Sequence, residues 1–188
     1  VNFTSITSED DSLSALGAID SLVEFLTSTY PEVFAVTEWQ IIGDHSLLLR
    51  WKGSGNEAPV IFYAHMDVVP VEENSEHSWR FKPFGEIPNH DTIYGRGTID
   101  DKAGVIGLLE ATSRLIKKGH QPTRDIYLAL GHDEETGGKN GAARLAQHLE
   151  KNSIKAAWIL DEGGMIAENM VPFVQLLVNE TTTAEKGF

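Results

Sequence analysis

The sequence predicts an α/β fold in which a central sheet, mostly parallel or mixed, carries helices on both faces. Short apolar runs typical of buried strands alternate with longer segments whose apolar residues recur at helical spacing. Such an alternation is typical of a sheet covered by helices. The chain has 188 residues and is 41% apolar, which suits one domain with a substantial core.

Three segments have the apolar spacing of helices. The first is predicted to begin at an N-cap, Ser8, and to stop at Pro31. The second spans residues 103–118 and is followed by Gly119, a residue type common just after helix ends. The third spans residues 141–151.

The remaining apolar runs predict strands, each bounded by polar or glycine-containing segments. Their ranges are 33–37, 39–42, 46–51, 60–64, 125–131, 156–160 and 173–178. Residues 70–92 contain proline, glycine and charge without a period, which predicts a long loop. No repeat or domain linker interrupts residues 1–188, so we expect one domain.

Composition excludes several classes of function. The net charge of -13 argues against a nucleic-acid surface, which needs clustered Lys and Arg. No apolar stretch approaches the roughly 18 residues of a membrane span. The chain has no cysteine, so a metal would have to bind His and carboxylate side chains. The triplets Asn2-Phe3-Thr4 and Asn179-Glu180-Thr181 match the N-glycosylation pattern and slightly favour a secreted or vacuolar/lysosomal location.

Four acidic or His-bearing stretches follow short apolar runs and point to a metal site. They are His65-Met66-Asp67, Asp100-Asp101, Glu134-Glu135 and Asp161-Glu162. In open α/β sheets, sites gather at the carboxyl ends of strands. One His and several carboxylates are the ligand types of a hard or borderline divalent metal, and this number of carboxylates favours a site for two ions.

Each stretch also has a purely structural explanation. His65 alone could be a polar loop residue, and Asp100 could be the N-cap of the helix that follows it. The pair Asp161-Glu162 could end a strand before a glycine turn. A run of acids such as Asp133 to Glu135 is electrostatically costly at a strand end without a nearby cation. Taken together, the four stretches favour the metal site.

Six ordered motifs also match a known family of enzymes. They are residues 64–71, Trp79 with 83–84, 94–102, 133–138, 160–164 and 184–188. On these motifs the chain resembles the di-zinc metallopeptidases of aminoacylase, carboxypeptidase S and carboxypeptidase G type. It is most similar to the carboxypeptidase S branch, from Tyr30 to its last residues.

The resemblance implies a set of metal ligands. His65 would bind one zinc, Asp100 would bridge both zincs, and Glu135 would bind the other. A carboxylate of the Asp161-Glu162 pair would complete the first site, with Glu162 favoured over Asp161.

The resemblance also implies the catalytic roles and the reaction. Asp67 would orient the zinc ligand His65, and Glu134 would be the general base. A cis peptide bond would join Asp100 and Asp101. The reaction would be zinc-dependent hydrolysis of an amide bond in a small peptide or an N-acyl amino acid.

The family's chains continue beyond a segment like Glu185-Lys186-Gly187 into a lid and dimerisation domain, and then return to supply a last His ligand. Residues 1–188 are therefore expected to be the N-terminal part of the catalytic domain. This part would be inactive by itself and would have an exposed apolar sheet edge, whereas the full-length protein would be a homodimer. Six further histidines match no ligand position and are expected at the surface or in loops: His45, His77, His90, His120, His132 and His148.

Two functions other than zinc-dependent amide hydrolysis are also considered for this sequence. A non-catalytic fragment or binding module could keep the fold without turnover. A metal-dependent phosphohydrolase would also use His and carboxylates at strand ends, but no phosphate-binding glycine loop accompanies the acids here.

Overall fold

The computed structural model describes residues 2–8, 14–85, 91–163, 166–171 and 174–178. Several sequence predictions fall outside these residues. They concern the first part of the first predicted helix (residues 9–13), His90, the glycosylation triplet at Asn179, and the last motif (residues 184–188).

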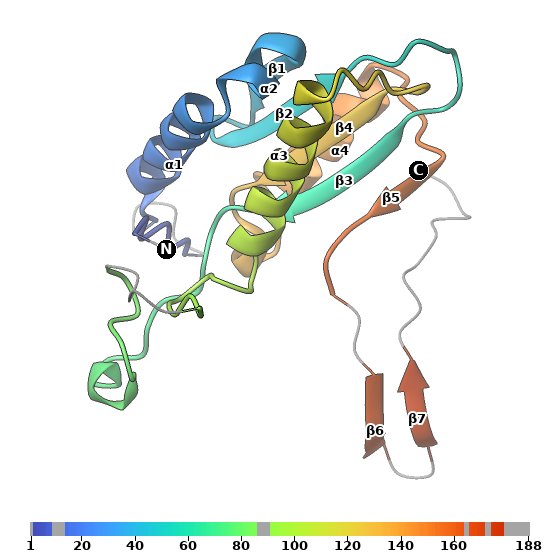
Figure 1. The fold of residues 1–188 in the computed structure, drawn as a ribbon. Coiled ribbons are helices and arrows are strands. Elements are labelled where there is room, and N and C mark those ends of the chain that lie inside the picture. The colour runs from blue at the N-terminus through green and yellow to red at the C-terminus, as the bar shows by residue number, and fades with distance from the viewer. Residues whose placement is uncertain (1, 9–13, 86–90, 164–165, 172–173, 179–188) are drawn as a thin grey trace.

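A five-stranded mixed sheet forms the centre of the fold (Figure 1). In the order β1-β2-β4-β3-β5, its strands are Glu38–Ile42, Ser46–Trp51, Ile126–Gly131, Val60–His65 and Trp158–Leu160. The pairs β1-β2 and β2-β4 are antiparallel, whereas β4, β3 and β5 run parallel. The predicted α/β class is confirmed, and the sheet is mixed.

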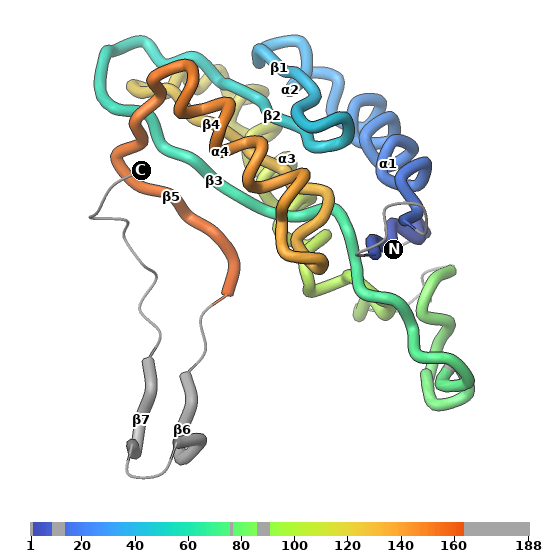
Figure 2. Tube along the Cα trace, turned by 180° about the vertical axis from the view of Figure 1, so that it is seen from behind, coloured from blue at the N-terminus to red at the C-terminus, as the bar shows by residue number. Residues whose placement is uncertain are grey.

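Helices cover both faces of this sheet (Figure 2). On one face lie α1 (Leu16–Thr29), α2 (Pro31–Val36) and α3 (Lys102–Lys117). On the other face lies α4 (Ala142–Lys151). Two short 3₁₀ turns, η2 (Glu76–Ser78) and η3 (Glu134–Thr136), lie in the connections.

Alternate residues of the central strands enter two separate cores. Leu47 and Leu49 of β2 pack in the core beneath α1, α2 and α3, whereas Leu48 packs in the core beneath α4. In β4, Leu128 and Leu130 join the first core, and Tyr127 joins the second. Because both faces of these strands are buried, their sequences are continuous apolar runs without alternation.

The predicted strand at residues 33–37 is wrong, because this segment is mostly the helix α2. Pro31 ends α1 as expected, but it is also the first residue of α2. The fixed φ of proline and its missing N–H suit the first turn of a helix. Burial of Val33 and Phe34 then decides the conformation of this short apolar segment.

The predicted N-cap at Ser8 is also wrong. Helix α1 begins at Leu16, and Ala15 occupies the N-cap position. The backbone N–H of Ser8 donates instead to Ser14 Oγ over 3.0 Å. Just before it, Ile6 forms a parallel β-bridge with Val68, so part of the N-terminal segment is paired with the chain that follows β3.

The last described strands form a separate two-stranded sheet. β6 (Ile166–Val171) pairs antiparallel with β7 (Val174–Val178). The sequence predicts β7, but not β6, in which Glu168 and Asn169 interrupt the apolar run.

β5 lies at the edge of the main sheet and is apolar. The side chains of Trp158, Ile159 and Leu160 are 38–46% exposed among the described residues, which agrees with the expected apolar sheet edge. No described helix combines the length and the apolarity that crossing a membrane requires.

Two leucines of α3 provide a test of this packing. Leu109 is fully buried and Leu115 is 40% exposed. We expect Leu109→Ala to lower the free energy of unfolding by about 2–5 kcal/mol, because it leaves a cavity between α3 and the sheet. The matched variant Leu115→Ala should cost less than about 1 kcal/mol. Urea denaturation measures both, and equal losses would contradict the packing described.

Candidate metal centre

One buried histidine and four carboxylates meet at the carboxyl end of the parallel strands. His65 is the last residue of β3. Glu134 and Glu135 lie in η3, just beyond β4, and Glu162 follows β5 closely. Because β4, β3 and β5 are parallel, their carboxyl ends meet at one edge. Asp100 does not follow a strand, contrary to prediction, and lies in the turn that leads into α3.

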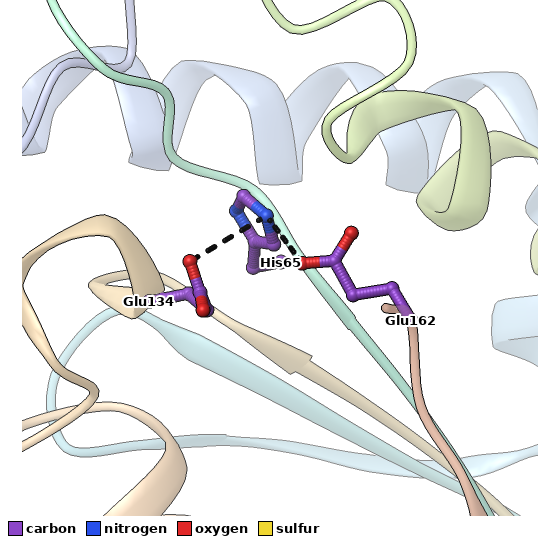
Figure 3. A group of neighbouring side chains, drawn as sticks. All are labelled: His65, Glu134 and Glu162. Carbon is purple, nitrogen blue, oxygen red and sulfur yellow. Dashed lines mark ion pairs between the residues drawn. The ribbon is translucent and has the colours of Figure 1, made fainter. Parts of the chain in front are cut away.

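The carboxylates surround one nitrogen of the His65 ring. His65 Nε2 is 2.9 Å from Asp100 Oδ1 and 3.1 Å from Glu162 Oε1. Glu134 Oε2 is 3.9 Å from the same nitrogen (Figure 3). Two groups, His65/Asp100/Glu135 and His65/Glu134/Glu162, each have potential ligand atoms within 4.8 Å of one another.

Asp67 holds the other nitrogen of the ring. His65 Nδ1 is 3.2 Å from Asp67 Oδ1, and both side chains are fully buried. A carboxylate at Nδ1 keeps the proton on that nitrogen and leaves Nε2 free for a metal, as in many metal-bound histidines. The structure therefore places Asp67 where the predicted orienting role requires it.

The pKa values of the site reflect its excess of negative charge. Burial alone would lower the pKa of His65. The hydrogen bond and charge of Asp67, the charge of Glu162 and the hydrogen bond to Asp100 outweigh burial and raise the pKa to about 10. Burial raises the pKa of Glu135 and of Glu162, and the neighbouring carboxylates raise both further. The site therefore favours a positive charge among its oxygens.

These residues fit a divalent cation. In the described part of the chain, no Lys or Arg forms an ion pair with the four carboxylates of the site. A bound cation would replace the proton on His65 Nε2 and neutralise the surrounding oxygens. Imidazole nitrogen and carboxylate oxygen are the donor types that zinc accepts in the absence of cysteine.

Of the two alternatives after β5, the structure places Glu162 in the site. Asp161 Oδ1 accepts a hydrogen bond from the backbone N–H of Glu162 over 2.8 Å. Asp161 belongs to neither group of potential ligands, whereas Glu162 lies beside His65. The two acids are adjacent in sequence, so only their surroundings distinguish them.

The sequence left open that Asp100 is the N-cap of the helix that follows it. This alternative is wrong, because Asp101 caps α3. Its carboxylate accepts hydrogen bonds from the N–H of Gly104 over 3.1 Å and of His65 over 3.3 Å. A Cβ at position 104 would collide with this carboxylate, which accounts for the glycine. The peptide bond between Asp100 and Asp101 is cis, as the resemblance implied. The hydrogen bonds of Asp101 turn its side chain inward, whereas the side chain of Asp100 is 65% exposed beside His65.

One of the other histidines is not a surface residue. His132 is 4% exposed and bonds to Ser46 Oγ through Nδ1 over 2.7 Å. It lies directly after β4, so burial at the sheet overrides the polarity of the residue. The remaining described members of the set are half-buried or exposed: His45, His77, His120 and His148.

Comparison with known proteins decides the family. Residues 61–187 match the sequence model of peptidase family M20/M25/M40. The chain belongs to this family. The predicted resemblance to carboxypeptidase S-type metallopeptidases is confirmed, because relatives of that name are among the matches to this M20 chain.

Two relatives and one solved structure illustrate the match. The M20 chain is 36% identical to an N-fatty-acyl-amino acid synthase/hydrolase of Xenopus tropicalis, over 90% of this chain and 33% of that protein. It is 40% identical to a carboxypeptidase S-like protein of Dictyostelium discoideum, over 87% of this chain and 34% of that protein. An M20 family metallo-carboxypeptidase from Sulfolobus solfataricus has the same fold, with a TM-score of 0.65 at 23% identity over 89% of this chain and 38% of that one. The chain thus spans about a third of the length of these curated relatives.

Replacing His65 tests the metal centre. We expect His65→Ala to weaken zinc binding by more than about 100-fold. Replacing a residue that only hydrogen-bonds to a metal ligand usually weakens binding by about 10–100-fold, and His65 is itself a proposed ligand. His148→Ala on α4 is the matched control and should leave the affinity unchanged, because the His148 ring lies outside both groups of potential ligands and, among the described residues, bonds to Gln40 and Asn152. Isothermal titration calorimetry with zinc measures both variants. Comparable losses in the two would exclude a specific site at His65.

The raised pKa of His65 predicts that metal affinity depends on pH. Because this pKa is about 10, the ring of the metal-free chain is protonated at neutral pH. A metal must displace that proton, so affinity should rise about tenfold for each unit of pH below that pKa. Zinc titrations between about pH 6 and 8, in buffers of different ionisation enthalpy, should show release of about one proton per histidine-bound metal. An affinity that does not change with pH would contradict the prediction.

Proposed function

We propose that the protein is a zinc-dependent amidohydrolase that cleaves an amide bond in small peptides or N-acyl amino acids. The observation that carries the proposal is the meeting of His65 Nε2 with acidic side chains from three connections, in a chain of the M20 family. The names of two relatives, an N-fatty-acyl-amino acid synthase/hydrolase and a carboxypeptidase S-like protein, support this substrate class.

Two zinc ions are proposed, with different protein ligands. His65, Asp100 and Glu162 would hold one ion, and Asp100 would share the second ion with Glu135. The short distances from Asp100 and Glu162 to His65 Nε2 support the first set, and the group His65/Asp100/Glu135 supports the bridging position of Asp100. When bound, a zinc pair supplies an acidified water and polarises the substrate carbonyl.

Glu134 is the proposed general base. Its carboxylate is 44% exposed and approaches His65 Nε2 only to 3.9 Å, so it lies at the rim of the ligand group. It can accept a proton from the attacking water and donate it to the leaving amine. Tyr63 stays protonated nearby, because burial and the surrounding carboxylates raise the pKa of its phenol.

Replacing Glu134 tests the catalytic role. In a protein that contains these residues and hydrolyses an N-fatty-acyl amino acid or a dipeptide, Glu134→Gln should lower kcat by about 10²–10⁴-fold. Zinc content should not change, because the amide keeps the shape of the side chain and the ligands remain. Glu150→Gln, an exposed position of α4, is the matched control. Unchanged turnover in Glu134→Gln would remove Glu134 from the role of base.

A comparison of the 188-residue chain with a longer protein that contains it distinguishes the enzyme from the alternative, a non-catalytic module that keeps the fold. We expect the chain to bind zinc and to hydrolyse these substrates little, because it spans only about a third of its relatives. A longer protein that contains it should turn them over and lose activity with a chelator. Zinc binding without turnover in the longer protein would favour the binding module. A homodimeric full-length protein and a secreted or vacuolar location remain predictions.

A further inference from the structure

The N-terminal segment (residues 2–8) lies against the chain that leaves β3, although about 60 residues separate the two in sequence (Figures 1 and 2). The N–H of Val68 donates to the carbonyl of Ser5 over 3.0 Å. Ser5 Oγ donates to the carbonyl of Met66 over 2.7 Å. Both bonds flank Asp67, so the segment is docked where the orienting carboxylate lies.

Thr7 of this segment contacts the carboxylate directly. Thr7 Oγ1 donates to Asp67 Oδ2 over 2.6 Å. Thr7 is 6% exposed and Asp67 is fully buried, so water cannot readily replace the hydroxyl. Among the described residues, Thr7 is the only one whose side-chain hydroxyl bonds to Asp67.

The Asp67 carboxylate connects three parts of the site. Its Oδ1 lies 3.2 Å from His65 Nδ1 and accepts from the N–H of Glu134 over 3.1 Å. Its Oδ2 accepts from Thr7 and from the N–H of Glu135 over 3.1 Å. These four interactions use the four lone-pair positions of a carboxylate. Asp67 therefore holds both a proposed zinc ligand and the backbone of the turn that carries the proposed base.

The same segment is fixed a second time near Asp100. Lys102 Nζ donates to the carbonyl of Phe3 over 2.9 Å, and Lys102 is 6% exposed. Burial lowers the pKa of Lys102 to about 8, and the charge of Asp67 opposes this shift. Lys102 is the first residue of α3 and follows the Asp100–Asp101 bond. The segment thus joins two of the loops that supply the site.

We propose that Thr7 is a positioning residue of the metal centre. Its hydroxyl fixes the rotation of the Asp67 carboxylate, which in turn orients the His65 ring and holds the backbone of Glu134 and Glu135. Thr7 carries no carboxylate or imidazole and acts through Asp67. The effect on metal binding rests on the proposed function, whereas the effect on the backbone of Glu134 and Glu135 does not.

Three variants of the 188-residue chain test this role. Thr7→Val removes the hydroxyl at nearly constant volume, and Thr7→Ser retains it. Thr112→Val is the matched control, because Thr112 is equally buried and, among the described residues, its hydroxyl donates within α3 to the carbonyl of Leu108. With zinc alone as the probe, calorimetry should show about 10–100-fold weaker binding for Thr7→Val. Thr7→Ser and Thr112→Val should bind as the parent chain does.

A second readout does not need the metal. In the zinc-free chain, hydrogen exchange followed by NMR should be faster at the amides of Glu134 and Glu135 in Thr7→Val. Thr7→Ser should restore protection, and Thr112→Val should leave these two amides unchanged. A merely structural role would instead speed exchange throughout β4. If Thr7→Val does not fold, Thr7→Cys replaces it, since a thiol is a weaker donor of similar size and should give a smaller change in the same direction.

Each outcome decides one of the two proposals. Parental zinc affinity and parental exchange in Thr7→Val would overturn the role of Thr7, as would uniformly faster exchange. Failure of the parent chain to bind zinc would count against the proposed function only. In that case, faster exchange confined to Glu134 and Glu135 would still support the positioning role, and unchanged exchange would overturn it.

Discussion

The burial of one carboxylate, Asp67, constrains the arrangement of the whole site. A fully buried anion is stable only if donors surround it, because it has lost its hydration. Here those donors come from β3, from the turn after β4 and from the N-terminal segment. Hydrogen bonds from His65 and Thr7 outweigh the effect of burial and lower the pKa of Asp67. The requirement for donors therefore assembles three distant segments around a single charge.

The same arrangement turns the rest of the acidic side chains toward one point. Asp67 occupies Nδ1 of His65, so Nε2 faces Asp100 and Glu162. Asp101 points inward to cap α3, which leaves Asp100 at the surface of the site. With no Lys or Arg paired to these oxygens in the described residues, a cation is the partner that the geometry favours.

Much of the fold follows from local sequence patterns, and the exceptions have physical causes. The continuous apolar runs of β2 and β4 predict strands because both faces of the central sheet are covered. The segment 33–37 has the composition of a strand, but it becomes α2 because Pro31 suits a first helical turn and Val33 packs into the core. β6 is missed because polar residues interrupt its apolar run. The secondary structure of such segments depends on the residues they contact in the sheet or the core. A local sequence pattern does not identify those residues.

The sequence by itself determined the kinds of chemical group at the site and their order along the chain: His65, Asp67, Asp100, the pair Glu134-Glu135 and the pair Asp161-Glu162. These residues lie in short motifs next to strands or helices, which is information that a local pattern carries. Only the tertiary structure decided that Glu162 and not Asp161 faces His65, that Asp101 caps α3, and that Thr7 supports Asp67. The physical reason is that hydrogen-bond partners are chosen by proximity in space, and some of these partners, such as Thr7 and Asp67, are 60 residues apart in the sequence.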